Sequence, residues 1–196
     1  MIWRSFRLLL LGLFAFNLFL YVSHHFDHRP RRGYAAAQNV ADGNSRLYFA
    51  TDTNLEEVDV AMIGHAERSI DIAMFAFTDR RLAVALRRAA EHGVKERIYR
   101  DRGQYEEEEN RGNGVGSILA GEPNISIKVK NSKELMHMKA ALYDDHLLRD
   151  GSGNWSISAA RYQDNEISVS DNAEMAHAFT SDFERMWSRP ENTVIQ

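Results

Sequence analysis

A histidine and a lysine two residues apart, followed by a glycine-rich string with a hydroxyl and an amide, are the residues of this chain best suited to chemistry. All of them lie in the string LMHMKAALYDDHLLRDGSGNWS. If Leu135–Tyr143 is a strand, its side chains alternate between the two faces, so that His137 and Lys139 lie side by side. Lysine neutralises negative charge, serine and asparagine donate hydrogen bonds, and histidine can attack or transfer protons. Together with Ser152 and Asn154, this pair predicts a site for a phosphate group.

The chain between these residues supplies the turns that bring them together. Asp144 and Asp145 are turn residues and predict a hairpin whose second strand is His146–Arg149. The glycines of Gly151–Ser156 let the backbone turn tightly, so that its polar side chains can point at one spot. A lone histidine beside a lysine on a strand is more commonly a solvated face, so the prediction depends on the whole string. The other histidines have no comparable neighbours and are interpreted as structural or solvent-facing: His24, His25, His28, His65, His92, His146 and His177.

The pattern HxKx4D at residues 137–144, followed by GSxNWS at residues 151–156, resembles the HKD signature of the phospholipase D superfamily. It is most similar to the small bacterial endonuclease-type members that have one motif per chain. The resemblance runs from about Ser45 to Trp187 and includes Ser69–Met74 and Gln163–Glu166. A chance match of the HxK element alone does not explain a resemblance of this extent.

This resemblance implies a role for each residue that matches the motif. His137 would attack phosphorus and form a covalent phosphohistidine, while a second histidine of the same kind protonates the leaving group and then activates water. Lys139 and Asn154 would hold the non-bridging oxygens, with Ser152 as a nearby donor, and such fixed groups stabilise the charge of a transition state. Glu166 would orient a histidine and fix its tautomer.

The resemblance also implies what the site needs from outside one chain. Asp144 would secure the turn rather than touch substrate. No metal or other cofactor is required, because two lysines and two histidines supply the positive charge. Since the chain holds one HKD copy, we predict a symmetric homodimer with a composite active site, whose axis brings two copies of His137 together.

Strands separated by helices predict the scaffold, an α/β or α+β layered domain. With the resemblance, the expected fold is α/β, a layered α-β-α sandwich with a central mixed β-sheet. Period-two alternation favours a strand at Ser69–Phe77. Helical spacing predicts a last helix over Ala173–Trp187 that buries Met175, Phe179, Phe183 and Met186. The other expected strands are Arg46–Ala50, Val94–Tyr99, Ile125–Val129 and Glu166–Val169, and the other expected helices end near His65 and near Gly93, the second capped by Thr78 or Asp79.

Three acidic features of the sequence are assigned no chemistry. The run Glu106–Glu109 is interpreted as a solvated helix face, because carboxylates at consecutive helical positions diverge and cannot converge on a metal. Glu96 interrupts a predicted strand where similar proteins place an apolar residue. Asp145 occupies a turn position that similar proteins often fill with glycine. Glu96 and Asp145 bear on local packing rather than on the site.

The N-terminal segment predicts export or membrane anchoring. Leu8–Val22 is an apolar run of fifteen residues that follows two arginines. At about 1.5 Å per residue, such a helix is shorter than a ~30 Å hydrocarbon core, and it suits the apolar region of a secretory signal. Ala35–Ala37 can supply a cleavage site, but its distance from the apolar run leaves an uncleaved anchor as the alternative. A buried core helix is disfavoured because the segment has no polar face.

The expected organisation is a signal peptide or membrane anchor with linker over residues 1–37 and a phospholipase D-like catalytic domain over residues 38–196. The expected location is the periplasm or the membrane of the cell envelope. The chain has no cysteine, which excludes disulfides, thiolate metal sites and cysteine nucleophiles and fits, without demonstrating, an exported protein.

The net charge and three local lysines bear on whether the substrate is nucleic acid or phospholipid. Residues 38–196 hold 19 Lys and Arg against 27 Asp and Glu, so binding of nucleic acid through overall charge is disfavoured. Three lysines upstream of His137 can line a groove that follows a phosphate backbone, although they equally fit the wet face of an edge strand. These are Lys128, Lys130 and Lys133.

We expect a metal-independent phosphodiesterase, a non-specific endonuclease that hydrolyses DNA or RNA. The alternative is a phospholipase D-type hydrolase of phospholipids at the cell envelope, which the hydrophobic N-terminus favours. A catalytically silent phosphate-binding module comes third, because such a module would be expected to have lost His137 or Lys139, and both are present.

Overall fold

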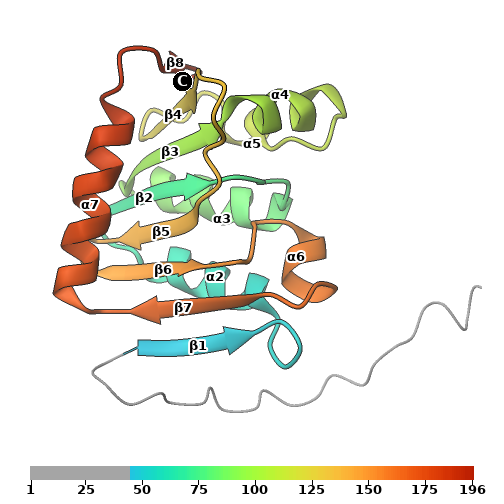
Figure 1. The fold of residues 1–196 in the computed structure, drawn as a ribbon, viewed down its shortest axis with the longest axis vertical. Helices are drawn as coiled ribbons and strands as arrows, with labels where there is room; N and C mark the ends of the chain where they lie inside the picture. The colour runs from blue at the N-terminus through green and yellow to red at the C-terminus, as the bar shows by residue number, and fades with distance from the viewer. Residues whose placement is uncertain (1–44) are drawn as a thin grey trace, which may run out of the picture. The chain divides into compact units, whose positions relative to one another are not determined.

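The computed structural model describes residues 45–196, in which eight strands form one mixed sheet in the order β1-β7-β6-β5-β2-β3-β4-β8 (Figure 1). The strands are β1 (Ser45–Phe49), β2 (Ser69–Met74), β3 (Lys95–Asp101), β4 (Ile125–Lys130), β5 (Lys139–Tyr143), β6 (Leu147–Gly151), β7 (Glu166–Ser170) and β8 (Thr193–Val194). The helices are α2 (Leu55–His65), α3 (Arg80–Glu91), α4 (Arg102–Asn110), α5 (Gly116–Leu119), α6 (Ile157–Arg161) and α7 (Ala173–Trp187).

The sheet is mixed because parallel and antiparallel strands meet at its centre. β2, β3 and β4 run parallel to one another, whereas β5 lies antiparallel to β2 and begins the antiparallel series through β6 and β7 to β1. The predicted α/β fold with a central mixed sheet is confirmed. The expected signal or anchor over residues 1–37 lies outside the described residues. Within residues 45–196, no helix is both long enough and apolar enough to cross a membrane.

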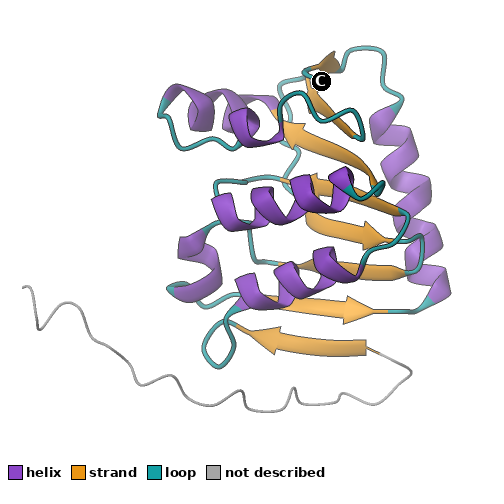
Figure 2. Ribbon diagram, turned by 180° about the vertical axis from the view of Figure 1, so that it is seen from behind, coloured by secondary structure: helices purple, strands orange, loops and turns teal. Residues whose placement is uncertain are grey.

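Helices cover both faces of the sheet (Figures 1 and 2). On one face, α3 buries Leu82 and Leu86 in a cluster that includes Ile72 and Tyr143. On the other face, α7 packs its aromatic residues against a cluster that includes Leu142. Neighbouring residues of β5 thus point to opposite cores, which is the side-chain alternation expected of a strand buried on both sides.

Short polar side chains cap the N-termini of α2 and α3. Asn54 accepts a hydrogen bond from the N–H of Glu56 at the start of α2. The Asp79 side chain accepts from the N–H groups of Arg81 and Leu82, so Asp79 caps α3 as the sequence allowed. The strand before α3 is shorter than predicted, because β2 ends at Met74 and the chain turns away toward the cap.

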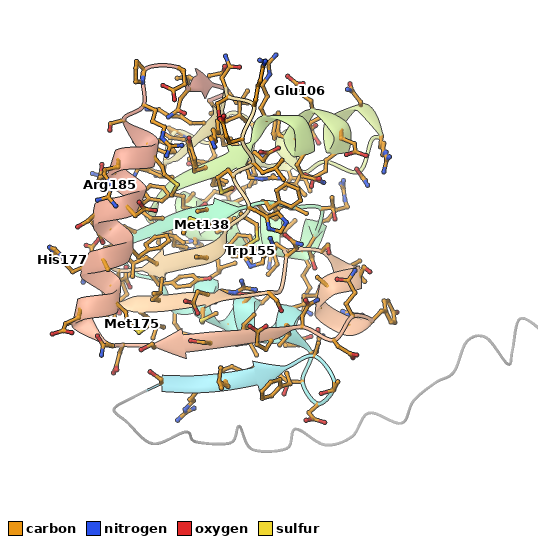
Figure 3. All side chains as sticks on the ribbon, in the orientation of Figure 1. Glu106, Met138, Trp155, Met175, His177 and Arg185 are labelled. Atoms are coloured by element: carbon orange, nitrogen blue, oxygen red, sulfur yellow. The ribbon has the colours of Figure 1, made fainter. Side chains whose placement is uncertain are left out.

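Two predictions about burial are wrong. Met175 is 39% exposed on α7 (Figure 3), because Ala176 is the residue in phase with Phe179 and Phe183 on the face that contacts the sheet. Glu108 is 3% exposed, so the four-glutamate run is not uniformly solvated. Its carboxylate forms a buried ion pair with Arg100 at 2.6 Å, which supplies the partner that a buried charge requires.

Candidate active site

Five of the predicted site residues lie at one edge of the sheet: His137, Lys139, Ser152, Asn154 and Glu166. β5 begins there with Lys139, which lies opposite Met74, the last residue of β2. β6 ends there with Gly151, opposite Ile167 near the start of β7. Since antiparallel neighbours begin where their partners end, the start of β5, the end of β6 and the start of β7 lie close together.

His137 lies in an irregular segment immediately before β5. The predicted strand Leu135–Tyr143 therefore forms only from Lys139 onward. The His137 side chain is exposed, and its ring lies 4.5 Å from the ring of Phe75, centroid to centroid, at 60°. An exposed imidazole that packs against one aromatic ring can meet a substrate without a large rearrangement.

Side chains and backbone groups from other elements hold this irregular segment. The Asp101 carboxylate accepts a hydrogen bond from the N–H of Met136 at 3.0 Å, and the N–H of Phe75 donates to the carbonyl of Met138 at 2.9 Å. The two bonds fix the residues on either side of His137. The imidazole thus projects from a backbone that is held on both sides although it belongs to no regular element.

Lys139 is 9% exposed and lies beside His137. Its Nζ donates to the carbonyl of His137 at 2.6 Å and lies 5.1 Å from the centroid of the Phe75 ring. Burial, and then the positive charge of Arg149, lowers the pKa of Lys139. The ammonium is thus fixed beside the backbone of His137. This contact, and not strand alternation, holds the two residues together, because His137 lies outside β5.

Asn154 is oriented by the segment that follows β2. Its Oδ1 accepts a hydrogen bond from the N–H of Ala76 at 3.0 Å, which leaves its Nδ2 as a donor without a partner among the described residues. The segment after β2 holds the backbone beside both Lys139 and Asn154. The N–H of Phe75 donates to the carbonyl of Met138, and the N–H of Trp155 donates to the carbonyl of Ala76 at 3.1 Å. Both Met138 and Trp155 are labelled in Figure 3.

Ser152 and Glu166 form a pair at the same edge. The Ser152 hydroxyl and its N–H both donate to the Glu166 carboxylate, the N–H at 3.1 Å. Burial raises the pKa of Glu166, but these hydrogen bonds outweigh it and hold the pKa below its ordinary value. Glu166 is therefore a carboxylate at neutral pH. Among the described residues its bonds go to Ser152, and none joins it to His137.

Asp144 lies at the opposite end of β5, away from these residues. Its carboxylate accepts hydrogen bonds from the N–H groups of Glu67, Arg68 and Ser69 at 2.9, 2.6 and 3.0 Å. Burial raises the pKa of Asp144, but these bonds outweigh it, so the pKa lies below its ordinary value. Asp144 and Asp145 have φ of 52° and 63°, as the predicted tight turn requires. The position fits the predicted turn role and gives Asp144 no contact with the site.

The three predicted substrate lysines have different environments. Lys128 donates from Nζ to the carbonyl of Trp187 at 3.0 Å and lies 4.6 Å from a Trp187 ring centroid, so it is engaged with α7. Lys130 reaches the carbonyl of Leu135 at 3.4 Å, and Lys133 is exposed in the segment before His137. Only Lys130 and Lys133 contact or lie in the segment that contains His137.

Two buried arginines that the sequence pattern did not predict support the site. Arg100 donates to the carbonyls of Met74 and Phe75 at 2.7 and 3.0 Å, and its partner Glu108 accepts from the N–H of Phe77 at 3.1 Å. Arg149, 0% exposed, is the second. Each occupies a strand position in phase with an inward apolar residue, and that phase is the signal that could have revealed them.

Comparison with known proteins identifies the family. Residues 60–187 match the family described as cardiolipin synthase, PLD-like domain. The curated mitochondrial cardiolipin hydrolase of Xenopus laevis is 26% identical over 137 residues, which are 70% of this chain and 62% of that protein. The human mitochondrial cardiolipin hydrolase is 27% identical over 124 residues, 63% of this chain and 47% of that protein. The chain thus spans less than two thirds of these relatives.

Solved structures agree with the family assignment. NucT from Helicobacter pylori is 26% identical, with a TM-score of 0.65 over 73% of this chain and 94% of that chain. A phospholipase D family member, Nuc from Salmonella typhimurium, has a TM-score of 0.70 at 17% identity, over 79% of this chain and 99% of that chain, which shows the shared fold. The chain belongs to the phospholipase D-like family, whose members are phosphodiesterases.

Proposed function

We propose that this protein is a metal-independent endonuclease that hydrolyses DNA or RNA through a covalent phosphohistidine. The observation that supports the proposal is that exposed His137 shares one sheet edge with Lys139 and Asn154, which we take to bind the phosphate, and is preceded by two further lysines. Lys139 and Asn154 are held at the same sheet edge. Lys130 and Lys133 lie in or beside the segment that leads to His137. A polymer with a phosphate on every unit can use both sets at once.

In the proposed reaction, a neutral His137 attacks phosphorus, and the bond between phosphorus and the leaving oxygen breaks. A second histidine gives its proton to that oxygen. The same second histidine then takes a proton from water, which attacks the phosphohistidine and restores free His137. Lys139 and the Nδ2 of Asn154 stabilise the negative oxygens in both steps.

The second histidine is proposed to come from a second copy of the chain in a symmetric homodimer. The chain has one HKD motif, and the reaction needs two histidines in opposite protonation states. Glu166 is an ionised carboxylate that contacts Ser152 and not His137 of its own chain. In the proposed dimer it is available to orient the histidine of the other copy. Sedimentation of the active protein tests this: a fully active monomer would contradict the composite site.

The substrate is tested with the full-length chain in EDTA. Single-stranded DNA, duplex DNA, RNA and phosphatidyl lipid vesicles are offered in parallel, with His137→Ala as the control. Cleavage of nucleic acid that persists in EDTA and disappears in H137A supports the proposal. Activity that requires added metal contradicts the mechanism, and silence on every substrate favours a phosphate-binding module.

Phospholipid is the second candidate substrate, and one observation favours it. Leu135, two residues before His137, is 64% exposed, and we propose that this apolar side chain would contact an acyl chain of a bound lipid. The names of the curated relatives point the same way. Turnover of phosphatidyl lipids without any cleavage of nucleic acid would establish this candidate instead.

The proposed place of the protein is the cell envelope. This proposal depends on the apolar run and flanking arginines of residues 1–37. Fractionation of cells that express the full-length chain tests it, with N-terminal sequencing of the recovered protein to find whether the segment is removed. Recovery in the cytosol alone would contradict export and anchoring together.

A further inference from the structure

Beneath the site, a buried guanidinium touches both halves of the motif. Arg149 on β6 donates from Nη1 to the carbonyl of Lys139 at 2.8 Å and from Nη2 to the carbonyl of Gly153 at 2.9 Å. Lys139 begins β5, and Gly153 stands between Ser152 and Asn154. One side chain therefore bridges the strand that supplies the ammonium and the loop that supplies the amide.

A carboxylate on the opposite side fixes the orientation of this guanidinium. Asp59 of α2 accepts from Arg149 Nε at 2.9 Å and from Nη2 at 3.1 Å. The side chains of Arg149 and Asp59 are 1% and 3% exposed. The four hydrogen bonds use four of the five donors of the guanidinium, and its planar fork defines the directions of all of them.

Stability alone is a poor reason for this arrangement. Replacing a buried ion pair by well-packed apolar residues is often neutral or stabilising, because both charges must leave water. An apolar residue at position 149 would fill the core but could not hold two carbonyls. What the arginine adds is a fixed distance between Lys139 and the Ser152–Asn154 loop.

We infer that Arg149, oriented by Asp59, is a positioning residue that sets the separation of the two phosphate ligands Lys139 and Asn154. The inference rests on the proposed function, since it takes these two groups to bind the phosphate. A misplacement of about 1 Å at a reacting centre can cost about 100-fold in rate. The arginine therefore controls activity without touching substrate.

The same residue also acts on Lys139 through its charge. Burial is the larger cause of the lowered pKa of Lys139, and the positive charge of Arg149 adds to it. Asp59 faces Arg149 from α2 and reduces that effect. Removing the charge of Arg149 raises the pKa of Lys139, so the titration of Lys139 moves to higher pH. An ion pair that stabilises the fold away from Lys139 would leave that titration unchanged.

Three variants of the full-length chain separate position from charge. Arg149→Lys keeps the charge but cannot span both carbonyls. Arg149→Met with Asp59→Leu removes the pair without leaving a lone buried charge. Arg97→Met with Asp71→Leu is the matched control, because this bidentate pair of β3 and β2, with Nε to Oδ1 at 2.7 Å, contacts no residue of the site.

Each variant is measured in three ways: affinity for inorganic phosphate by calorimetry, kcat/KM on bis(p-nitrophenyl) phosphate, and the titration of Lys139 by NMR of labelled lysine. We expect phosphate affinity and kcat/KM to fall about 10- to 100-fold in R149K and in R149M/D59L, and the Lys139 titration to move to higher pH in R149M/D59L alone. The control keeps all three at wild-type values.

Wild-type phosphate affinity and an unchanged Lys139 titration in a cooperatively folded R149M/D59L would overturn the inference. If that variant does not fold, R149K decides by itself, and wild-type affinity and kcat/KM there would overturn it. If the wild-type protein hydrolyses no phosphodiester, the proposed function fails. The phosphate affinities of the variants then still decide the inference.

Discussion

The two ends of β5 belong to one sequence motif and have different roles. At the end near Lys139, the backbone before the strand is irregular, and groups from distant elements hold it. At the other end, Asp144 and Asp145 adopt a tight turn with φ of 52° and 63°. There the Asp144 carboxylate ties the turn to the backbone that enters β2. The residues of one short motif thus divide between proposed chemistry at one end of β5 and folding at the other.

The largest effect is expected from His137→Ala, at the site end of β5. The imidazole is exposed and makes no hydrogen bond through its ring to another described residue, so its loss leaves stability unchanged. Removal of the proposed nucleophile lowers kcat by roughly three to six orders of magnitude. Hydrolysis of bis(p-nitrophenyl) phosphate and a thermal melt measure the two quantities. A substantial loss of Tm would show that the division between the ends is wrong.

A smaller effect on activity is expected from Asp101→Ala. The variant frees the N–H of Met136, so that His137 is no longer held from one side. We expect kcat/KM to fall about 10- to 100-fold, because the nucleophile loses its fixed position. Asp101 also caps α4 by accepting from the N–H of Gln104. Asp79→Ala is therefore the matched control, because Asp79 is likewise buried and caps α3 but contacts no residue of the His137 segment. Equal losses of activity in both variants would mean that the effect reflects stability alone.

At the turn end, Asp144→Ala is expected to affect folding and not catalysis. The variant loses three hydrogen bonds from N–H groups to a carboxylate, which costs about 2–4 kcal/mol of unfolding free energy. Urea unfolding measures the loss, and kcat of the folded protein stays at the wild-type value. Asp145→Ala is the control, because it places alanine at a neighbouring exposed position with similar φ. Its loss of stability measures the backbone cost of alanine, which is subtracted from the loss in D144A.

The contribution of Asp144 also depends on pH in a defined direction. Its pKa is lower in the folded protein than in the unfolded chain, so the stabilisation is complete above the ordinary pKa of an aspartate and is lost as the pH falls through the lower folded value. The difference between wild type and D144A is therefore expected to shrink in acid. A difference that grows in acid would contradict the hydrogen bonds assigned to the ionised carboxylate.

Much of this arrangement could be predicted from residue pattern. The alternation around Lys139 and the paired aspartates gave β5 and its turn, because strand periodicity and turn chemistry are local properties. The start of β5 was placed four residues too early. The residues Leu135–Met138 alternate like a strand, but Asp101 and Phe75 take up their backbone groups, and neither neighbour is visible from local sequence.

The ion pairs beneath the site could not be predicted in the same way. Glu108 lies in a run of four glutamates, and Arg149 follows two leucines in a predicted strand. Charged residues are seldom fully buried, and the run of glutamates favours exposure for Glu108. Strand phase alone points to an inward position for Arg149 but does not reveal the partner that makes its burial possible. Each is buried because a partner from another element neutralises it, Arg100 for Glu108 and Asp59 for Arg149. Such pairing depends on the tertiary structure.

The smallest expected effect lies near the turn end of β5 and concerns a buried acid that has no such partner. Glu96 of β3 lies opposite Ile70, which lies opposite Tyr143 at the end of β5. It is 1% exposed, and neither carboxyl oxygen has a hydrogen-bond partner among residues 45–196. Burial, and then the negative charge of Glu122, raises the pKa of Glu96 to about 9.

Ionisation of an acid whose pKa is raised on folding contributes nothing to the free energy of unfolding below the ordinary pKa, and destabilises the fold increasingly as the pH rises toward the folded value. We therefore expect Glu96→Leu to stabilise the protein at pH 8 by about 1–3 kcal/mol and to do little at about pH 4. Glu96→Gln, which cannot ionise, should remove the pH dependence alone. Urea unfolding at both pH values checks this, with kcat unchanged because Glu96 contacts no residue of the site. Equal stabilisation at both pH values would contradict the raised pKa. It would mean that Glu96 is charged in the folded protein and that a partner outside the described residues neutralises it.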